Sequence, residues 1–205
     1  MKIQNAAFTL IELLVVVAII ATVAAFTAPA LNSMLEGVQL TQSTKMLYDQ
    51  LNLARQSAVS SNRVIEVRFY QCADPSVGGS NQRYRAIQMF QLQNDGTASP
   101  MDKLYKMTGV IMDSGTSLSP LLGAATAKQW TATDTKIPLP QVGVNYTANV
   151  LDLRPDRTTN LTLTGQPWYV TLHYENKGDN LNSLPANFAI FQVDPMDGGV
   201  QMYRP

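Results

Sequence analysis

The sequence predicts an α+β protein in which one long N-terminal helix packs on an antiparallel β-sheet head. The first observation is a helical pattern that begins as a continuous apolar run and continues as an apolar stripe up to residue 58. The second is a change of period near Arg63, after which apolar and polar residues alternate as they do in strands. With 205 residues, the chain is long enough for one sizeable core.

The apolar run predicts a membrane-spanning helix. Of residues 8–30, 18 of 23 are apolar, and residues 13–31 form 19 positions without a charge. As a helix these span roughly 28 Å, close to the hydrocarbon thickness of a bilayer. We therefore expect residues 8–31 to form a transmembrane half of the helix. Pro29 is expected to kink a continuous helix rather than to begin a new one.

The first turns of this run resemble the processing site of type IV prepilins and type II secretion pseudopilins. The resemblance lies in residues 7–16, AFTLIELLVV. It implies that prepilin peptidase cuts between Ala7 and Phe8, removes residues 1–7 as a leader peptide and methylates the new amine of Phe8. Glu12 then becomes the fifth residue of the mature chain and Pro29 the 22nd, two positions at which the family carries an acidic residue and a proline. Ala7 stands where the family usually has glycine.

Glu12 is the only charge within the apolar run. A carboxylate in hydrocarbon costs a few kcal/mol on insertion scales, and a neighbouring cation would offset that cost. The resemblance implies that this cation is the mature N-terminal amine of an adjacent subunit, which makes Glu12, with Pro29, an assembly residue. The alternative is a carboxylate that snorkels to the nearby edge of the membrane.

Residues 32–62 are expected to form the amphipathic half of the helix. Five apolar residues recur at helical spacing and form one stripe that fits a single partner surface. They are Leu40, Leu47, Leu51, Ala54 and Ala58. Asn62 is suited to a left-handed cap that ends the helix.

Residues 63–205 are expected to form the β-rich head. Strands are predicted near residues 65–70, 84–92, 110–112, 148–153, 168–174, 188–193 and 200–203. Turns are predicted at residues 94–96 and 197–199, and a polar loop is predicted around Pro75 and Gly78. Residues 114–135 are rich in small and polar residues, which favours an irregular excursion with at most a short helix.

Residues 54–59, ARQSAV, are followed by Asn62-Arg63 and a predicted strand. This junction resembles that of minor pseudopilins of the GspH/FimT type. Within the wider family, the Verru_Chthon cassette protein D group is similar at residues 64–70, 83–86, 151–157 and 203–205. The resemblance implies a structural, non-catalytic minor subunit whose partners are prepilin peptidase and, through the N-terminal helix, other pilin or pseudopilin subunits. It places the protein in the inner (cytoplasmic) membrane as a single-pass protein with a periplasmic head, and then in a filament.

The composition argues against an enzyme. One Cys and one His leave no multi-histidine metal centre and no Cys-rich metal site. We interpret Cys72 as an unpaired thiol in a loop just past a strand, and His173 as a hydrogen-bonded sheet residue. Asp194 and Asp197 supply fewer oxygens than Ca²⁺ prefers, so a plain turn is favoured. No catalytic residue, metal or cofactor is expected.

Two other functions stay open. A DNA-binding minor pilin would need clustered cations, and the densest basic group is only Arg83 with Arg85 in a chain of zero net charge. Nucleic acid is therefore not an expected partner. A secreted globular protein would be released by signal peptidase after Ala28-Pro29-Ala30, although the apolar run is longer than a usual signal sequence and contains Glu12.

The processing site gives a first test. We expect the mature chain to begin at Phe8 with a methylated amine. N-terminal sequencing and mass spectrometry of the protein from its native membrane would measure this. A chain that begins at Leu31 would instead identify a secretory signal.

Overall fold

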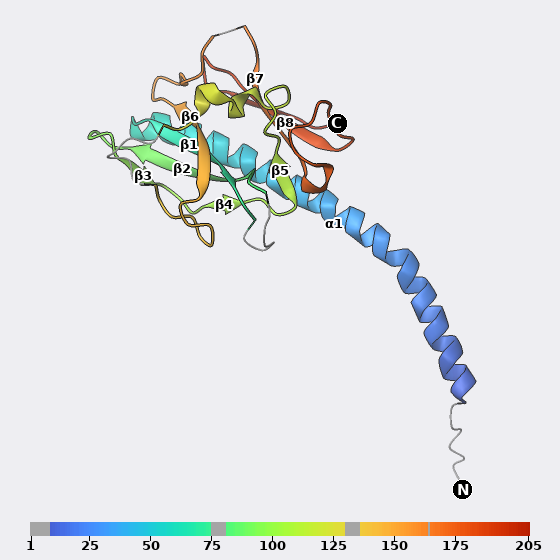
Figure 1. Cartoon of the computed structure of the whole chain (residues 1–205). Coiled ribbons are helices and arrows are strands. Elements are labelled where there is room, and N and C mark those ends of the chain that lie inside the picture. The colour runs from blue at the N-terminus through green and yellow to red at the C-terminus, as the bar shows by residue number, and fades with distance from the viewer. Residues whose placement is uncertain (1–8, 75–80, 130–135, 164) are drawn as a thin grey trace. The chain divides into compact units, whose positions relative to one another are not determined.

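The computed structural model describes residues 9–74, 81–129, 136–163 and 165–205, and it leaves the side chains of residues 27–33 undescribed. Helix α1 (Leu10–Ser61) runs without interruption through position 29, so Pro29 does not begin a new helix. Contacts divide the chain into two compact units, Met1–Val38 and Gln39–Pro205. The element order is one helix followed by strands (Figure 1).

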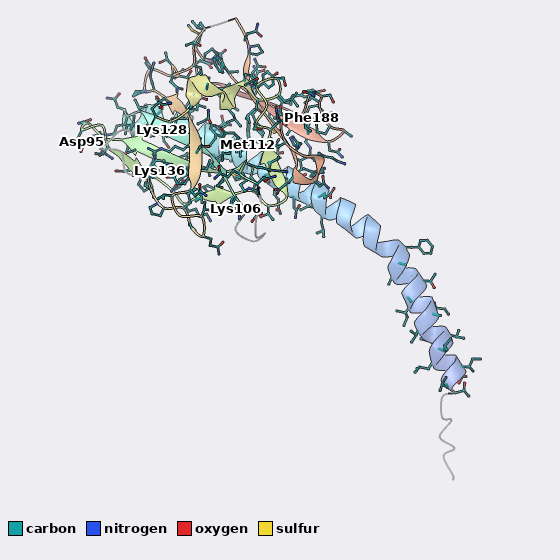
Figure 2. All side chains as sticks on the ribbon, viewed as in Figure 1. Asp95, Lys106, Met112, Lys128, Lys136 and Phe188 are labelled. Atoms are coloured by element: carbon teal, nitrogen blue, oxygen red, sulfur yellow. The ribbon has the colours of Figure 1, made fainter. Side chains whose placement is uncertain are left out.

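The described part of the first unit is a helix with apolar side chains in solvent. From Leu10 to Phe26, all large apolar side chains are exposed, with fractions between 49% and 82%. Figure 2 shows these side chains spread around the helix. A search of the described residues finds no helix with the length and apolarity needed to cross a membrane.

The second unit contains one antiparallel sheet, to which nine strands contribute among the described residues. The strands are β1 (Ile65–Cys72), β2 (Arg83–Leu92), β3 (Ala98–Pro100), β4 (Tyr105–Lys106), β5 (Val110–Met112), β6 (Tyr146–Leu153), β7 (Trp168–Tyr174), β8 (Phe188–Val193) and β9 (Val200–Tyr203). Their order is β6-β1-β2-β5-β7-β8-β9, with β3 and β4 paired to β2.

The apolar stripe of α1 forms one side of the main core. Leu40, Leu47, Leu51, Ala54 and Ala58 are fully buried, as the sequence predicts. They cluster with inward-facing side chains of the central strands. Burying one leucine stabilises the fold by about 1.5–3 kcal/mol, so this stripe holds the helix on the sheet. Asn62 follows with φ 51°, which confirms the predicted left-handed cap.

The other face of the sheet is covered as well. A second cluster joins Tyr70 and Phe90 on the strands to Leu139 and Tyr146. The polar residues of β1 on this face are therefore buried and not exposed to solvent. Arg68 pairs with Glu66 at 2.7 Å, and its guanidinium lies 3.9 Å from the ring centre of Phe90.

Most expected strands are present, and the differences are local. The structure adds β3 and β4, which are only two or three residues long and too short to show a period. The irregular stretch contains two single-turn 3₁₀ helices, η1 (Pro120–Leu122) and η2 (Ala124–Thr126). The turn predicted at residues 94–96 forms, and the turn predicted at residues 197–199 lies two residues earlier, at residues 195–197. The loop expected around Pro75 and Gly78 lies outside the described residues.

The compact second unit predicts an independent head. A chain truncated to begin at Glu36 keeps the whole buried stripe, and we expect it to be soluble, monomeric and rich in sheet. A chain that begins at Arg63 loses the stripe, exposes the core face of the sheet and should aggregate. Size-exclusion chromatography and circular dichroism compare the two, and equal behaviour would mean that α1 does not complete the core.

Candidate functional site

The N-terminal residues singled out by the sequence lie at or before the start of α1. Ala7 and Phe8 lie outside the described residues. Glu12 occupies the first turn of the helix. Pro29 lies within the helix, but its side chain is among those not described.

Glu12 forms reciprocal hydrogen bonds with Thr9. Its Oε2 accepts from the backbone N–H and from the hydroxyl of Thr9, both at 2.8 Å. The backbone N–H of Glu12 donates in return to the Thr9 hydroxyl at 3.3 Å. This is a capping box, which satisfies donors that every helix leaves free at its N-terminus.

The capping box gives Glu12 a partner within its own chain. This partner differs from the two that the sequence predicts for the carboxylate, which are a cation from another subunit and solvent at the membrane edge. The pattern Thr-x-x-Glu ahead of an apolar run is the sequence signature that could have revealed the local role.

The apolar surface of residues 10–26 surrounds the helix and has no polar stripe. Leu10, Phe26 and the residues between them present it in every direction. Exposed apolar surface of this extent marks a site of contact with lipid or with other proteins. In this part of the chain, the candidate functional site is therefore a helix surface and not a pocket.

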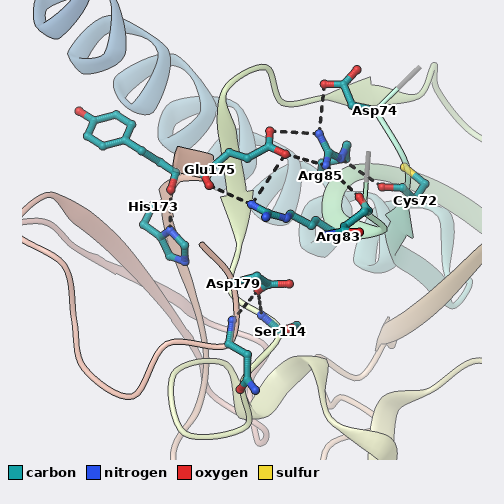
Figure 3. A network of polar contacts seen from close by, with 11 residues as sticks. Cys72, Asp74, Arg83, Arg85, Ser114, His173, Glu175 and Asp179 are labelled. Atoms are coloured by element: carbon teal, nitrogen blue, oxygen red, sulfur yellow. Dashed lines mark hydrogen bonds and ion pairs between the residues drawn. The ribbon is translucent and has the colours of Figure 1, made fainter. Parts of the chain in front are cut away.

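The side chains of the basic pair Arg83 and Arg85 form hydrogen bonds and ion pairs with other residues of the head (Figure 3). Arg85 is fully buried, and its guanidinium donates to Asp74 at 3.1 Å and to Glu175 at 2.9 Å. Arg83 donates to the backbone carbonyl of Glu175 at 2.9 Å. These two arginines serve internal ion pairs, so they do not form a surface that could bind phosphates.

Cys72 is the last residue of β1 and is buried, which corrects the expectation that it lies in a loop. Burial raises the pKa of its thiol, against the opposing effect of the positive charge of Arg85. A buried thiol with a raised pKa is a poor nucleophile.

His173 is confirmed as a hydrogen-bonded sheet residue. It is fully buried, with Nδ1 2.9 Å from the carbonyl oxygen of Tyr174 and Nε2 3.1 Å from Oδ2 of Asp113. Asp113 also accepts from the backbone N–H groups of Gly115 and Leu181 at 2.8 and 3.0 Å. The pair therefore joins β5, β7 and the loop that follows η3 (Glu175–Lys177).

The two aspartates near the C-terminus lie in the turn between β8 and β9. Asp194 accepts from the backbone N–H of Met196 at 2.7 Å, and Asp197 accepts from that of Gly199 at 2.5 Å. Asp197 also lies 3.6 Å from the guanidinium of Arg55. Across the residues that the structure describes, no group of three or more His, Cys, Asp or Glu could hold a metal ion.

Comparison with protein families identifies the N-terminal segment. Residues 3–28 match the family model described as the prokaryotic N-terminal methylation motif. This match spans Ala7, Phe8 and Glu12 and ends just before Pro29. A search of curated proteins finds no significant match.

Solved structures of low similarity include two minor pilin-type proteins. The minor pseudopilin EpsH of the type 2 secretion system of Vibrio cholerae is 15% identical, with a TM-score of 0.44 over 82% of this chain and 94% of that chain. The type IV minor pilin FimU of Pseudomonas aeruginosa is 13% identical, with a TM-score of 0.44 over 83% and 95%. At this level of identity and structural overlap, the similarities carry no functional inference.

The comparisons therefore identify a family for the N-terminal segment. This methylation motif lies at the start of a long helix whose C-terminal half packs on an antiparallel sheet.

The buried Asp113 provides a test of the structural interpretation of His173. Asp113→Ala leaves buried donors of three residues without a partner, and we expect it to destabilise the head by about 3 kcal/mol. Asp156→Ala is the matched control. Asp156 accepts from Thr158 in an exposed turn, and its loss should cost about 1 kcal/mol or less. Urea unfolding measures both, and equal losses would contradict a structural role for the Asp113–His173 pair.

Proposed function

We propose that the chain is a structural, non-catalytic subunit of a type IV pilus or of a type II secretion pseudopilus-like filament, where it serves as a minor component. Prepilin peptidase cuts it before Phe8 and methylates the new amine. The observation that carries the proposal is the methylation motif over residues 3–28, which opens a helix with exposed apolar side chains.

The exposed surface of residues 10–26 supports an anchoring and assembly role. In the subunit before assembly, hydrocarbon of the inner membrane covers these side chains, and the head lies in the periplasm. In the filament, the same surfaces of other subunits replace the lipid. Because lipid is as apolar as leucine, close packing and polar contacts, rather than a hydrophobic gain, must favour the exchange.

Glu12 supplies the polar contact. Its carboxylate accepts hydrogen bonds from Thr9 in the single chain and retains its charge for a cation. The methylated amine of an adjacent subunit is that cation, and the contact sets the axial position of one subunit against the next. Pro29 removes one backbone hydrogen bond within the helix, which allows it to bend during assembly.

No specific observation favours the two alternative functions. DNA binding would require arginines directed outward, whereas Arg83 and Arg85 bond to Glu175 and Asp74. The exposed cation nearest the C-terminus, Arg204, donates to Thr41 of α1 at 2.8 Å.

Substitutions at Glu12 test the assembly role. Glu12→Ala is expected to insert into the membrane and to be cleaved before Phe8, but to assemble poorly, because the incoming amine loses its counter-ion. Glu12→Gln keeps a hydrogen-bond acceptor for Thr9 and removes the charge, and it should behave like Glu12→Ala. Glu12→Asp keeps the charge at a shorter reach and should be intermediate.

Thr9→Ala is the matched control, since it removes the side chain of the capping box and keeps the charge of Glu12. We expect it to assemble. Crosslinking and co-purification with partner pilins in native membranes, at equal protein abundance, measure each variant. Normal assembly of Glu12→Gln together with failure of Thr9→Ala would assign Glu12 to helix capping and overturn the ion pair.

A further inference from the structure

The two edges of the sheet differ in their protection. At the β6 edge, isolated bridges pair Asn149 with Ala127 and Leu153 with Thr159, and Lys128 N donates to the carbonyl of Ala148 at 2.8 Å. At the other edge, β9 pairs only with β8 among the described strands. Strand β9 contains no lysine, proline or bulge of the kind that protects natural sheet edges.

The register shows which backbone groups of β9 point outward. Asp194 N donates to the carbonyl of Gly199 at 2.9 Å, so these residues form a hydrogen-bonded pair. Hydrogen-bonded and non-bonded pairs alternate along an antiparallel ladder. Gln201 opposite Gln192 is therefore bonded, whereas Val200 opposite Val193 and Met202 opposite Phe191 are not. The N–H and C=O groups of Val200 and Met202 point away from β8.

Helix α1 lies beside this edge and is tied to both ends of β9. Arg55 Nε donates to the carbonyl of Asp197 at 3.0 Å, just before the strand. Arg204 donates to Thr41 just after it. A groove of about 330 Å³ lies between the two elements, with Tyr48, Asn52 and Arg55 on the helix and Gly199, Val200 and Gln201 on the strand side.

Acidic side chains line one part of the groove. Asp194 and Asp197 both line it, and Arg55 is the one cation among its described lining residues. Arg55 is already paired with Asp197, whereas Asp194 has no ion pair among the described residues. The lining therefore has an excess of one negative charge and favours a basic side chain near Asp194.

We propose that the β9 edge and this groove bind an extended, basic peptide segment of another polypeptide by strand addition. Outward N–H and C=O groups at every second residue match the spacing of a second strand, and a helix beside the edge provides a wall for its side chains. Met202 and Tyr203, which are 47% and 60% exposed, offer apolar contact to the same segment. This site does not depend on filament assembly through the N-terminal helix.

The test uses the full-length chain in detergent and a fluorescent synthetic peptide of alternating threonine and lysine, ten residues long. Fluorescence anisotropy measures binding, and hydrogen exchange follows the amides of Val200 and Met202. We expect saturable binding that slows the exchange of both amides. Met202→Pro removes one outward N–H and should weaken binding by about tenfold or more, whereas Met202→Leu keeps the backbone and should not.

Two further peptides serve as controls for the mode of binding. A peptide N-methylated at alternate residues cannot complete the ladder and should fail to bind the unaltered protein, so the test stands even if Met202→Pro misfolds. A peptide with glutamate in place of lysine should bind more weakly. Binding that is insensitive to N-methylation, or absent, overturns the proposal. Protection of Val200 and Met202 that rises with protein concentration alone would assign the edge to a second copy of the chain and overturn it as well.

Discussion

The contact between one stripe of α1 and one face of the sheet holds the head together. Five side chains between residues 40 and 58 are fully buried there, and together they close a core that reaches from β1 to β8. A single antiparallel sheet with an open apolar face is not stable in water, and the helix provides the cover. Because the stripe belongs to residues that precede the sheet, the head cannot complete its core without the C-terminal half of the helix.

The same helix changes its chemistry along its length. In residues 39–61 five apolar side chains form a buried stripe that packs on the sheet, whereas Leu53 and Val59 lie outside this stripe and are exposed. In residues 10–26 the apolar side chains point in every direction, and no part of the described chain covers them. One half of α1 completes a domain, and the other half presents an exposed apolar surface, which is the surface on which the proposed function rests. The capping box of Thr9 and Glu12 caps the N-terminus of the apolar half. Glu12 is the one charged residue within residues 10–26.

Polar residues in the head serve its internal structure. Arg68 pairs with Glu66, and Arg85 pairs with Asp74 and with the partly exposed Glu175; both arginines are themselves buried. Removing one partner of such a pair leaves a buried charge uncompensated, which costs several kcal/mol. These pairs therefore specify how the loops lie over the sheet, and they are not available for ligands. The candidate surfaces lie elsewhere, on the apolar helix and at the edge of β9.

Local sequence patterns determine much of the secondary structure of this protein and its N-terminal motif. Features that depend on period or on neighbouring side chains can be predicted from short stretches of sequence. These are the helical stripe over residues 40–58, the alternation that marks the long strands, the cap at Asn62 and the methylation motif. Strands β3 and β4 cannot be predicted in this way, because two or three residues show no period. The capping box could be predicted from the sequence alone, because Thr9 and Glu12 are three residues apart.

Tertiary structure decided the features that join distant residues. Nothing in the sequence near His173 indicates Asp113, and nothing near Arg85 indicates Glu175. Tyr70 of β1 is buried because it packs against Leu139 and Tyr146, about 70 residues later in the chain. The groove beside β9 exists only because the last strand lies along a helix formed at the start of the chain. Side-chain period specifies which face of an element is apolar, but only the packing of the whole chain specifies what meets that face.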